Sequence, residues 1–305
     1  MASRPFPVLY CARVADNEQT PFRFGVNLLG FTSHEELTAK AREAERLGYD
    51  VVCIPDHLGF PAPFPSLVAA ARATSRVRLG TFVLNTAFYN PVLLARDVAS
   101  TDRLVDGRLD LGLGTGYVES EFDRAGIPFP TPGKRIDHLK HTIAELRRAF
   151  DELEPAPAQR PTPPLLLGGH GDRMLRLAAR EADIVGFTGH SYTPSGLVVA
   201  NAEEMDERVA FVRKEAGDRA DELEFNLLVQ RVVVTDDRAA ALEKLSREFF
   251  DIPADTLGQV PYLLVGTLDE IAEQVRAHRE RYGITYFTVL DNAMTDFAAV
   301  FDRLR

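Results

Sequence analysis

Two polar residues that can move protons, Asp56 and His57, stand directly after the apolar run 50–54. Histidine exchanges a proton near neutral pH, so it can act as a general acid or base. Asp56 can instead cap a turn, with His57 packed beside it. The surrounding elements decide between these interpretations, because proton transfer requires that the pair lie where a ligand binds.

A glycine-rich segment, GLGTG at positions 112–116, closes another apolar run, 109–113. Glycine permits tight turns and lets a backbone approach a ligand closely. A bend at a strand end is the alternative interpretation. The polar residues that follow favour a ligand-binding role, and they are Tyr117, Glu119, Ser120 and Glu121.

A second glycine-rich segment, GGHG at positions 168–171, lies between the run 164–167 and a helix that we expect to begin near Asp172. The N–H groups at the start of a helix bind anions such as phosphate. Arg173 can add a charged contact. A tight turn without a ligand is the alternative, but three glycines are more than a turn needs, which favours a phosphate site.

A metal site is not expected. His138 and His141 have a possible metal-ligand spacing, but we expect both inside a helix over 135–150 and away from the strand ends. No third ligand accompanies them. The first run lacks the His-x-His of many metal-dependent barrel hydrolases, and the sequence has no Gly-x-Ser-x-Gly nucleophile motif.

The elements that position these residues form a strict alternation of apolar β-rich runs and helical segments from Phe22 onward. The pattern predicts parallel strands covered by helices. No Gly-x-Gly-x-x-Gly follows the first run, and the number of runs favours closure into a (β/α)8 TIM barrel over an open doubly wound sheet. The runs are 22–28, 50–54, 77–84, 109–113, 164–167, 184–187, 225–234 and 285–290.

Helix boundaries and loops support this arrangement. Capping boxes are expected at Ser33 with Glu36 and at Thr267 with Glu270, and Gly48 and Gly283 are expected to end the same two helices. The long connections 117–134 and 188–202 follow strands, so they should project from the face of the barrel where active sites lie. The proline-rich stretch 155–164 precedes a strand and should lie at the opposite end.

Composition limits the function classes. The chain has 305 residues and a formal charge of −10, which argues against broad nucleic-acid binding. Cys11 and Cys53 suit neither a disulfide framework nor a metal site, which fits a reducing cytoplasm. No signal peptide is apparent, and no apolar run approaches the ~18 residues needed to span a membrane.

We expect an irregular leader over 1–21, with a possible strand over 8–14, and one catalytic barrel domain over 22–305.

Taken together, the ordered motifs resemble the bacterial luciferase-like superfamily, and within it the coenzyme F-420-dependent oxidoreductases. The resemblance covers nearly the whole chain from Phe22. It rests on LGTFVLN at 79–85, YNP at 89–91, DGRLDLGLGTG at 106–116, Glu121, GIPF at 126–129, LGG at 167–169 and AD at 182–183.

The resemblance implies that a flavin or deazaflavin, coenzyme F-420 or alternatively FMN, binds at the strand C-termini, and that the protein is a homodimer acting on a small molecule. Asp56 and His57 would lie beside the reactive ring. Val83 would push its backbone against the ring, often through a non-proline cis peptide. The polar edge of the ring would be lined by Asn85, Gly116 and Ser120, and the phosphate would be held by Gly168, Gly169 and His170.

One departure from the family concerns the substrate. Sugar-phosphate dehydrogenases of this family carry a proton-donating glutamate where this chain has Tyr117. The ordinary pKa of tyrosine is much higher, so a sugar phosphate is not the expected substrate.

We predict hydride transfer between F-420 and a small organic substrate, with reduction of an activated C=C or C=N bond. His57 would supply the proton, and Tyr117 would orient the substrate or donate a hydrogen bond. The alternatives are an FMN-dependent luciferase-like monooxygenase and a non-catalytic flavin-binding protein.

Overall fold

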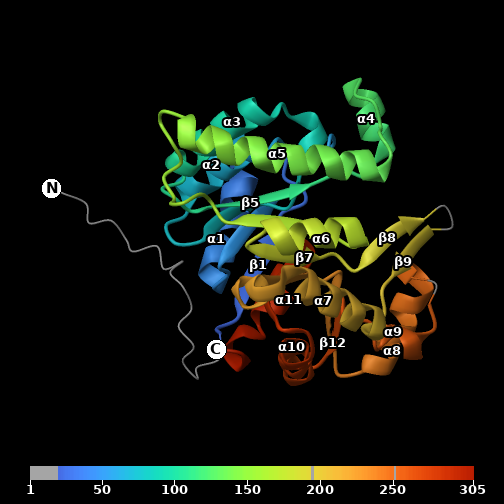
Figure 1. The fold of residues 1–305 in the computed structure, drawn as a ribbon. Helices are drawn as coiled ribbons and strands as arrows, with labels where there is room; N and C mark the ends of the chain where they lie inside the picture. Colours follow the sequence, from blue (N-terminus) through green and yellow to red (C-terminus); the bar gives the residue numbers. More distant parts are fainter. Residues whose placement is uncertain (1–19, 194–195, 251) are drawn as a thin grey trace.

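The computed structural model describes residues 20–193, 196–250 and 252–305 (Figure 1). The expected leader, apart from its last two residues, lies outside them, as do the possible strand over 8–14 and Cys11.

A closed parallel barrel forms the centre of the described molecule. Its strands follow one another around the barrel in chain order, and the last pairs with the first. The predicted fold class is therefore confirmed. The eight barrel strands are β1 (Arg23–Asn27), β2 (Val51–Ile54), β3 (Arg78–Thr81), β5 (Leu109–Gly114), β6 (Leu165–Gly169), β7 (Ile184–Phe187), β10 (Glu224–Leu228) and β13 (Ile284–Leu290).

Helices connect the strands and cover the barrel (Figure 1). The main covering helices are α1 (His34–Leu47), α2 (Pro63–Ala73), α3 (Pro91–Leu104), α5 (Pro132–Glu152), α6 (Asp172–Glu181), α7 (Ala202–Ala216) and α10 (Leu268–Tyr282). Shorter ones are η1 (Thr86–Phe88), α4 (Glu119–Ala125), η2 (Gly217–Glu222), α8 (Arg238–Leu245), η3 (Ser246–Phe250), α9 (Ala254–Leu257), η4 (Asp291–Ala293), α11 (Met294–Ala298) and η5 (Phe301–Arg303).

The helix boundaries largely follow the predicted caps. The capping box at Thr267 and Glu270 is complete. At the start of α1, Ser33 accepts the N–H of Glu36, but the Glu36 carboxylate accepts from Thr32 rather than from Ser33. Both helices end at a glycine in the left-handed region, with φ +94° at Gly48 and +78° at Gly283, as glycine allows.

Two of the expected strands are interrupted. The run 77–84 divides into β3 and the short β4 (Leu84–Asn85), which continues along β5. The run 225–234 was expected as one strand, but it divides into β10 and β11 (Arg231–Val234). The backbone N–H of Gln230 donates to the carbonyl of Tyr262 at 2.8 Å, so the chain leaves the barrel there. β11 then pairs with β12 (Leu263–Gly266), a strand that the apolar pattern did not predict.

The connection 188–202 contains a two-stranded antiparallel hairpin rather than a plain loop. Its strands are β8 (His190–Thr193) and β9 (Gly196–Val199). The root of the hairpin is held from outside, because Gln230 donates its side-chain amide to the carbonyl of Thr188 at 3.1 Å. In Figure 1 the hairpin, α4 and the α8–α9 segment lie toward the same side of the molecule.

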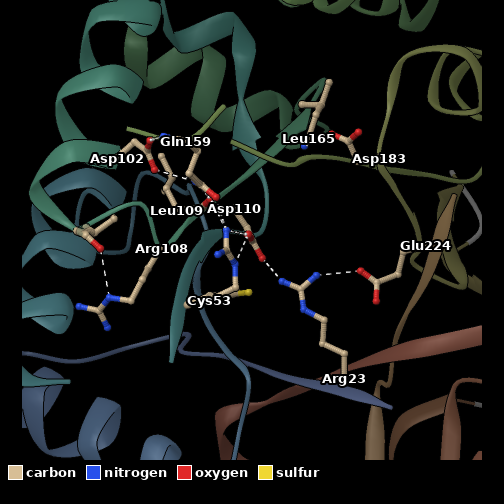
Figure 2. Close-up of polar contacts among 12 residues, drawn as sticks. Arg23, Cys53, Asp102, Arg108, Leu109, Asp110, Gln159, Leu165, Asp183 and Glu224 are labelled. Atoms are coloured by element: carbon tan, nitrogen blue, oxygen red, sulfur yellow. Dashed lines mark hydrogen bonds and ion pairs between the residues drawn. The ribbon is translucent and has the colours of Figure 1, made fainter. Parts of the chain in front are cut away.

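The opposite end of the barrel is closed by a buried charged cluster (Figure 2). Asp110 on β5 forms ion pairs with Arg23 of β1 and with Arg78 of β3, where Nη2 lies 2.6 Å from Oδ1. Arg23 also pairs with Glu224 of β10 at 2.8 Å. Burial alone would raise the pKa of Asp110, but the two guanidinium groups outweigh it and hold that pKa below its usual range.

The proline-rich stretch 155–164 lies at this end, as expected. Its Gln159 accepts from Arg78 at 2.8 Å and donates to the carboxylate of Asp102 on α3, also at 2.8 Å (Figure 2). Ion pairs and hydrogen bonds thus join the N-terminal ends of the strands. The candidate site is therefore sought at their C-terminal ends.

Candidate active site

Asp56 anchors the loop after β2 to the end of β4. Its Oδ2 accepts the backbone N–H of Asn85 at 3.0 Å, and the Tyr89 hydroxyl bonds to the same carboxyl group. Burial raises the pKa of Asp56, and these hydrogen bonds offset part of that rise. The structure therefore gives Asp56 the anchoring role that its position after a strand left open.

His57, the next residue, points its ring toward α4. Its Nδ1 lies 2.9 Å from Oε1 of Glu121, and the two side chains are 28% and 14% exposed. A carboxylate only accepts, so Nδ1 carries the hydrogen in the neutral ring and the lone pair is on Nε2. This orientation suits a residue that exchanges a proton with a ligand through Nε2.

Glu121 is held in place by the packing of α4. Phe122, the next residue, is fully buried, and its ring lies 4.8 Å from that of Phe129 and 5.7 Å from that of Phe88 in η1. The helix is thus fixed against the segment that follows β4. The sequence placed Glu121 among the polar residues after β5 but gave it no role, because spacing alone could not distinguish it from Glu119.

We predict that Glu121 positions His57. Glu121→Ala should lower kcat about tenfold to a hundredfold while KM changes by less than about twofold, because the ring loses the partner that fixes its orientation. In alkaline buffer, where the ring is neutral, nitrogen NMR of His57 should show a single tautomer with its hydrogen on Nδ1 in the wild type and a mixture of tautomers in the variant. This role would be contradicted if Glu121→Ala left the tautomer of His57 unchanged, or if the variant kept full activity although the tautomers were mixed.

The central part of the strand ends is occupied by Val83 and glycines. The Phe82–Val83 peptide bond is cis, as the resemblance implies. A Cβ on Gly114 of β5 would lie 2.6 Å from a methyl carbon of Val83, and one on Gly112 would lie 2.0 Å from the carbonyl oxygen of Thr81. β5 therefore needs glycine at both positions, because Thr81 at the end of β3 and Val83 after it lie against this strand.

Asn85 and Gly116 are brought together from β4 and the loop after β5. A Cβ on Gly116, whose φ is +66°, would lie 2.4 Å from Nδ2 of Asn85. Asn85 is buried, and its side chain accepts the N–H of Ala87 and so caps η1. Ser120 lies exposed in the first turn of α4, and no hydrogen bond within the described part of the chain joins it to this pair.

The second glycine-rich segment ends β6 and starts α6 at Asp172, as predicted. Gly171 is the N-cap residue, and no side chain of the described residues caps this helix. Packing explains the glycine at position 169, since a Cβ there would lie 2.4 Å from Cγ of Met174. Gly171 has open space around it, so packing does not explain it. Arg173 forms an ion pair with Asp137 of α5 at 2.8 Å.

The histidines and cysteine considered for metal binding have other surroundings. His138 was expected away from the strand ends, but its Nε2 lies 3.1 Å from the carbonyl oxygen of Thr86, directly after β4. Cys53 is buried in the barrel, and burial raises the pKa of its thiol to about 12. Within residues 20–193, 196–250 and 252–305, no three His, Cys, Asp or Glu side chains are grouped as metal ligands would be.

The helices in the same ranges include none with the length and apolar character needed to cross a membrane.

The fold and this site define a luciferase-like barrel protein. The family model described as luciferase-like monooxygenase matches residues 19–256, more than half of the chain. The chain therefore belongs to the luciferase-like monooxygenase family.

Particular relatives are similar to this chain over part of its length. The F-420-dependent glucose-6-phosphate dehydrogenase of Intrasporangium calvum is 37% identical over 128 residues, which cover 38% of each chain. The chain spans 66% of the length of the Mycobacterium tuberculosis relatives that it matches, with 29% identity over 196 residues.

Two solved structures share the fold at low identity. An F-420-dependent secondary alcohol dehydrogenase in complex with an F-420–acetone adduct gives a TM-score of 0.75 at 18% identity, covering 94% of this chain and 100% of its own. The long-chain alkane monooxygenase LadA gives a TM-score of 0.75 at 15% identity, covering 94% and 92%.

Proposed function

We propose that this chain is a coenzyme F-420-dependent oxidoreductase that reduces an activated C=C or C=N bond of a small organic substrate. The observation that carries the proposal is the His57–Glu121 pair at the end of β2, a proton-transfer group oriented at 2.9 Å. The choice of F-420 is supported by the similarity to an F-420-dependent dehydrogenase.

The residues at the strand ends fit such a group. The Val83 methyl groups face Gly112 and Gly114, and its backbone would lie against the flat ring. Asn27, at the end of β1, has a buried Oδ1 without a hydrogen-bond partner among the described residues, so it can accept from a ligand N–H. The polar edge of the ring would be met by Asn85, Gly116 and Ser120.

The phosphate would be held by backbone N–H groups of Gly168, Gly169 and His170 beside the start of α6. A helix start without a capping side chain retains N–H groups for an anion. The positive end of the helix dipole adds to the attraction.

Reduced F-420, when bound, supplies a hydride, which carries two electrons. His57, with both ring nitrogens protonated, would donate the Nε2 proton to the other atom of the substrate double bond and return to the neutral ring with its hydrogen on Nδ1, so that one hydride and one proton are added in total. The Tyr117 ring lies 5.8 Å from the His57 ring, close enough for its hydroxyl to orient a substrate there. Tyr117 stands where the sugar-phosphate dehydrogenases that this chain resembles carry a proton-donating glutamate, and its ordinary pKa is much higher, so a sugar phosphate is not the proposed substrate.

The runner-up is an FMN-dependent monooxygenase, which the family description and the alkane monooxygenase neighbour favour. The experiment is a turnover assay with reduced F-420 and a panel of enones and imines, run with and without oxygen. The proposal expects oxidation of F-420 coupled to substrate reduction without oxygen. Turnover that requires reduced FMN and consumes oxygen would favour the runner-up, and no turnover with either would favour a carrier protein.

Gly168→Ala should weaken F-420 binding about tenfold without destabilising the fold. A Cβ at Gly168 meets its nearest neighbours at 3.8 Å, which is ordinary contact, so the barrel accepts it. The added methyl group would, however, hold a ligand away from the backbone. Fluorescence titration with F-420 measures the effect. Gly30→Ala is the matched control, since a Cβ at Gly30 would meet nothing within 4 Å. Equal affinity in both variants would remove Gly168 from the proposed cradle.

A further inference from the structure

Two aromatic side chains flank the ring of His57. The Phe60 ring centroid lies 5.7 Å from that of His57 at an interplanar angle of 85°, and the Tyr117 centroid lies 5.8 Å away at 83°. Phe60 belongs to the loop after β2 and Tyr117 to the loop after β5. Phe60 lies in the same turn as His57, whose carbonyl accepts the Phe60 N–H at 3.0 Å. Tyr117 comes from a separate loop, so local spacing does not force its approach to His57.

Both aromatic side chains remain open to solvent. Phe60 is 41% exposed and Tyr117 is 55% exposed. Scattered exposed apolar residues are common, but two large rings beside one candidate proton donor form a local apolar surface. Aromatic side chains offer a large contact area and prefer the faces or edges of other flat rings. The surface around His57 therefore suits a flat, apolar ligand.

The ionisable groups next to His57 are carboxyl groups. The ionisable side chain bonded to His57 is the carboxylate of Glu121, and Asp56 precedes His57 in the chain. Among the described side chains that the hydrogen bonds and ring contacts of His57 involve, none is a cation. An anionic substrate would have to lose water beside the Glu121 carboxylate, and among the described contacts only His57 itself could offset that charge, which is unfavourable.

We propose that Phe60 and Tyr117 select an uncharged, flat, conjugated carbonyl compound bearing an aromatic ring, and that Phe60 is a specificity-determining residue. This inference rests on the proposed function, since it concerns the acceptor of the same site. Phe60 contacts the substrate ring, whereas His57 serves the reacting bond. The reactive double bond would lie toward His57, and the aromatic group would lie between the two side chains.

The test compares ligands that differ in one feature. Binding of 4-phenylbut-3-en-2-one, pent-3-en-2-one and glucose 6-phosphate is measured by calorimetry, with and without oxidised F-420, which prevents turnover. We expect the aromatic ketone to bind at least about tenfold more tightly than the aliphatic one, as one aromatic contact provides. Phe60→Ala should remove most of that difference, Phe60→Leu about half of it, and the control Leu93→Ala, exposed on α3, none.

Equal binding of the two ketones, no effect of Phe60→Ala, or tighter binding of glucose 6-phosphate would each overturn the inference. The proposed function has a separate readout in the same experiment. If the ketone preference and its dependence on Phe60 hold, the inference stands even where F-420 itself gives no binding signal, and only the proposed cofactor then fails.

Discussion

His57→Ala is expected to lower kcat/KM for substrate reduction by about 10²- to 10⁴-fold, the range that general acid catalysis supplies. The reduction adds a proton to the substrate, and His57 is the oriented group that the site offers for it. Binding of F-420 should change by less than about twofold, because the proposed ring and phosphate contacts come from other residues. Steady-state oxidation of reduced F-420 with an enone substrate measures the first quantity, and fluorescence titration measures the second.

The matched control for this variant is His34→Ala. His34 is exposed at the start of α1 and should leave both quantities unchanged. If His57→Ala retains full turnover, the proton comes from another group and the role assigned to His57 is wrong. If the variant instead loses cofactor binding with turnover, His57 supports the cofactor rather than the chemistry.

Asp110→Ala should lower the free energy of unfolding by about 3–5 kcal/mol, the usual cost of removing one partner from a buried ion pair. The variant leaves Arg23 and Arg78 without the carboxylate that lies between them, while Gln159 and Glu224 remain as their other partners. Urea unfolding at neutral pH measures the change. Asp302→Ala is the control, because Asp302 is exposed in η5 and its loss should cost less than about 0.5 kcal/mol.

The pH dependence follows from the lowered pKa of Asp110. The stability that this carboxylate contributes is fully present above the unfolded-state pKa of about 3.9 and is lost as the pH falls through the lower folded-state pKa. The difference between wild type and Asp110→Ala should therefore be constant near neutral pH and shrink in strong acid. A difference that grows on acidification, or one below about 1 kcal/mol at pH 7, would contradict the assigned role of the cluster.

The barrel was predictable because its signals are local. Apolar runs mark the strands, and Thr267 with Glu270 marks a helix start that the structure reproduces. The division of 225–234 was not predictable, because it depends on contacts with a distant part of the chain. The N–H of Gln230 donates to the carbonyl of Tyr262, and β11 then pairs with β12 outside the barrel. The apolar sequence pattern of a strand is the same whether the strand pairs inside the barrel or outside it.

The site was only partly predictable for a related reason. Positions after strand ends identify Asp56 and His57, because the fold gathers strand ends at one face. The contact of His57 with Glu121 joins residues 64 apart, and it depends on how α4 packs through Phe122. The approach of Phe60 and Tyr117 depends likewise on two loops, whose paths the sequence pattern does not specify.

The most direct test of the central claim is a fluorescence titration of the purified protein with coenzyme F-420 and, separately, with FMN. We predict saturable binding of F-420 at one site per chain, with FMN at least about tenfold weaker, and weaker binding of F-420 by Gly168→Ala. Tight binding of FMN with no response to F-420 would contradict the proposed function and place the chain among the flavin-dependent monooxygenases of its family.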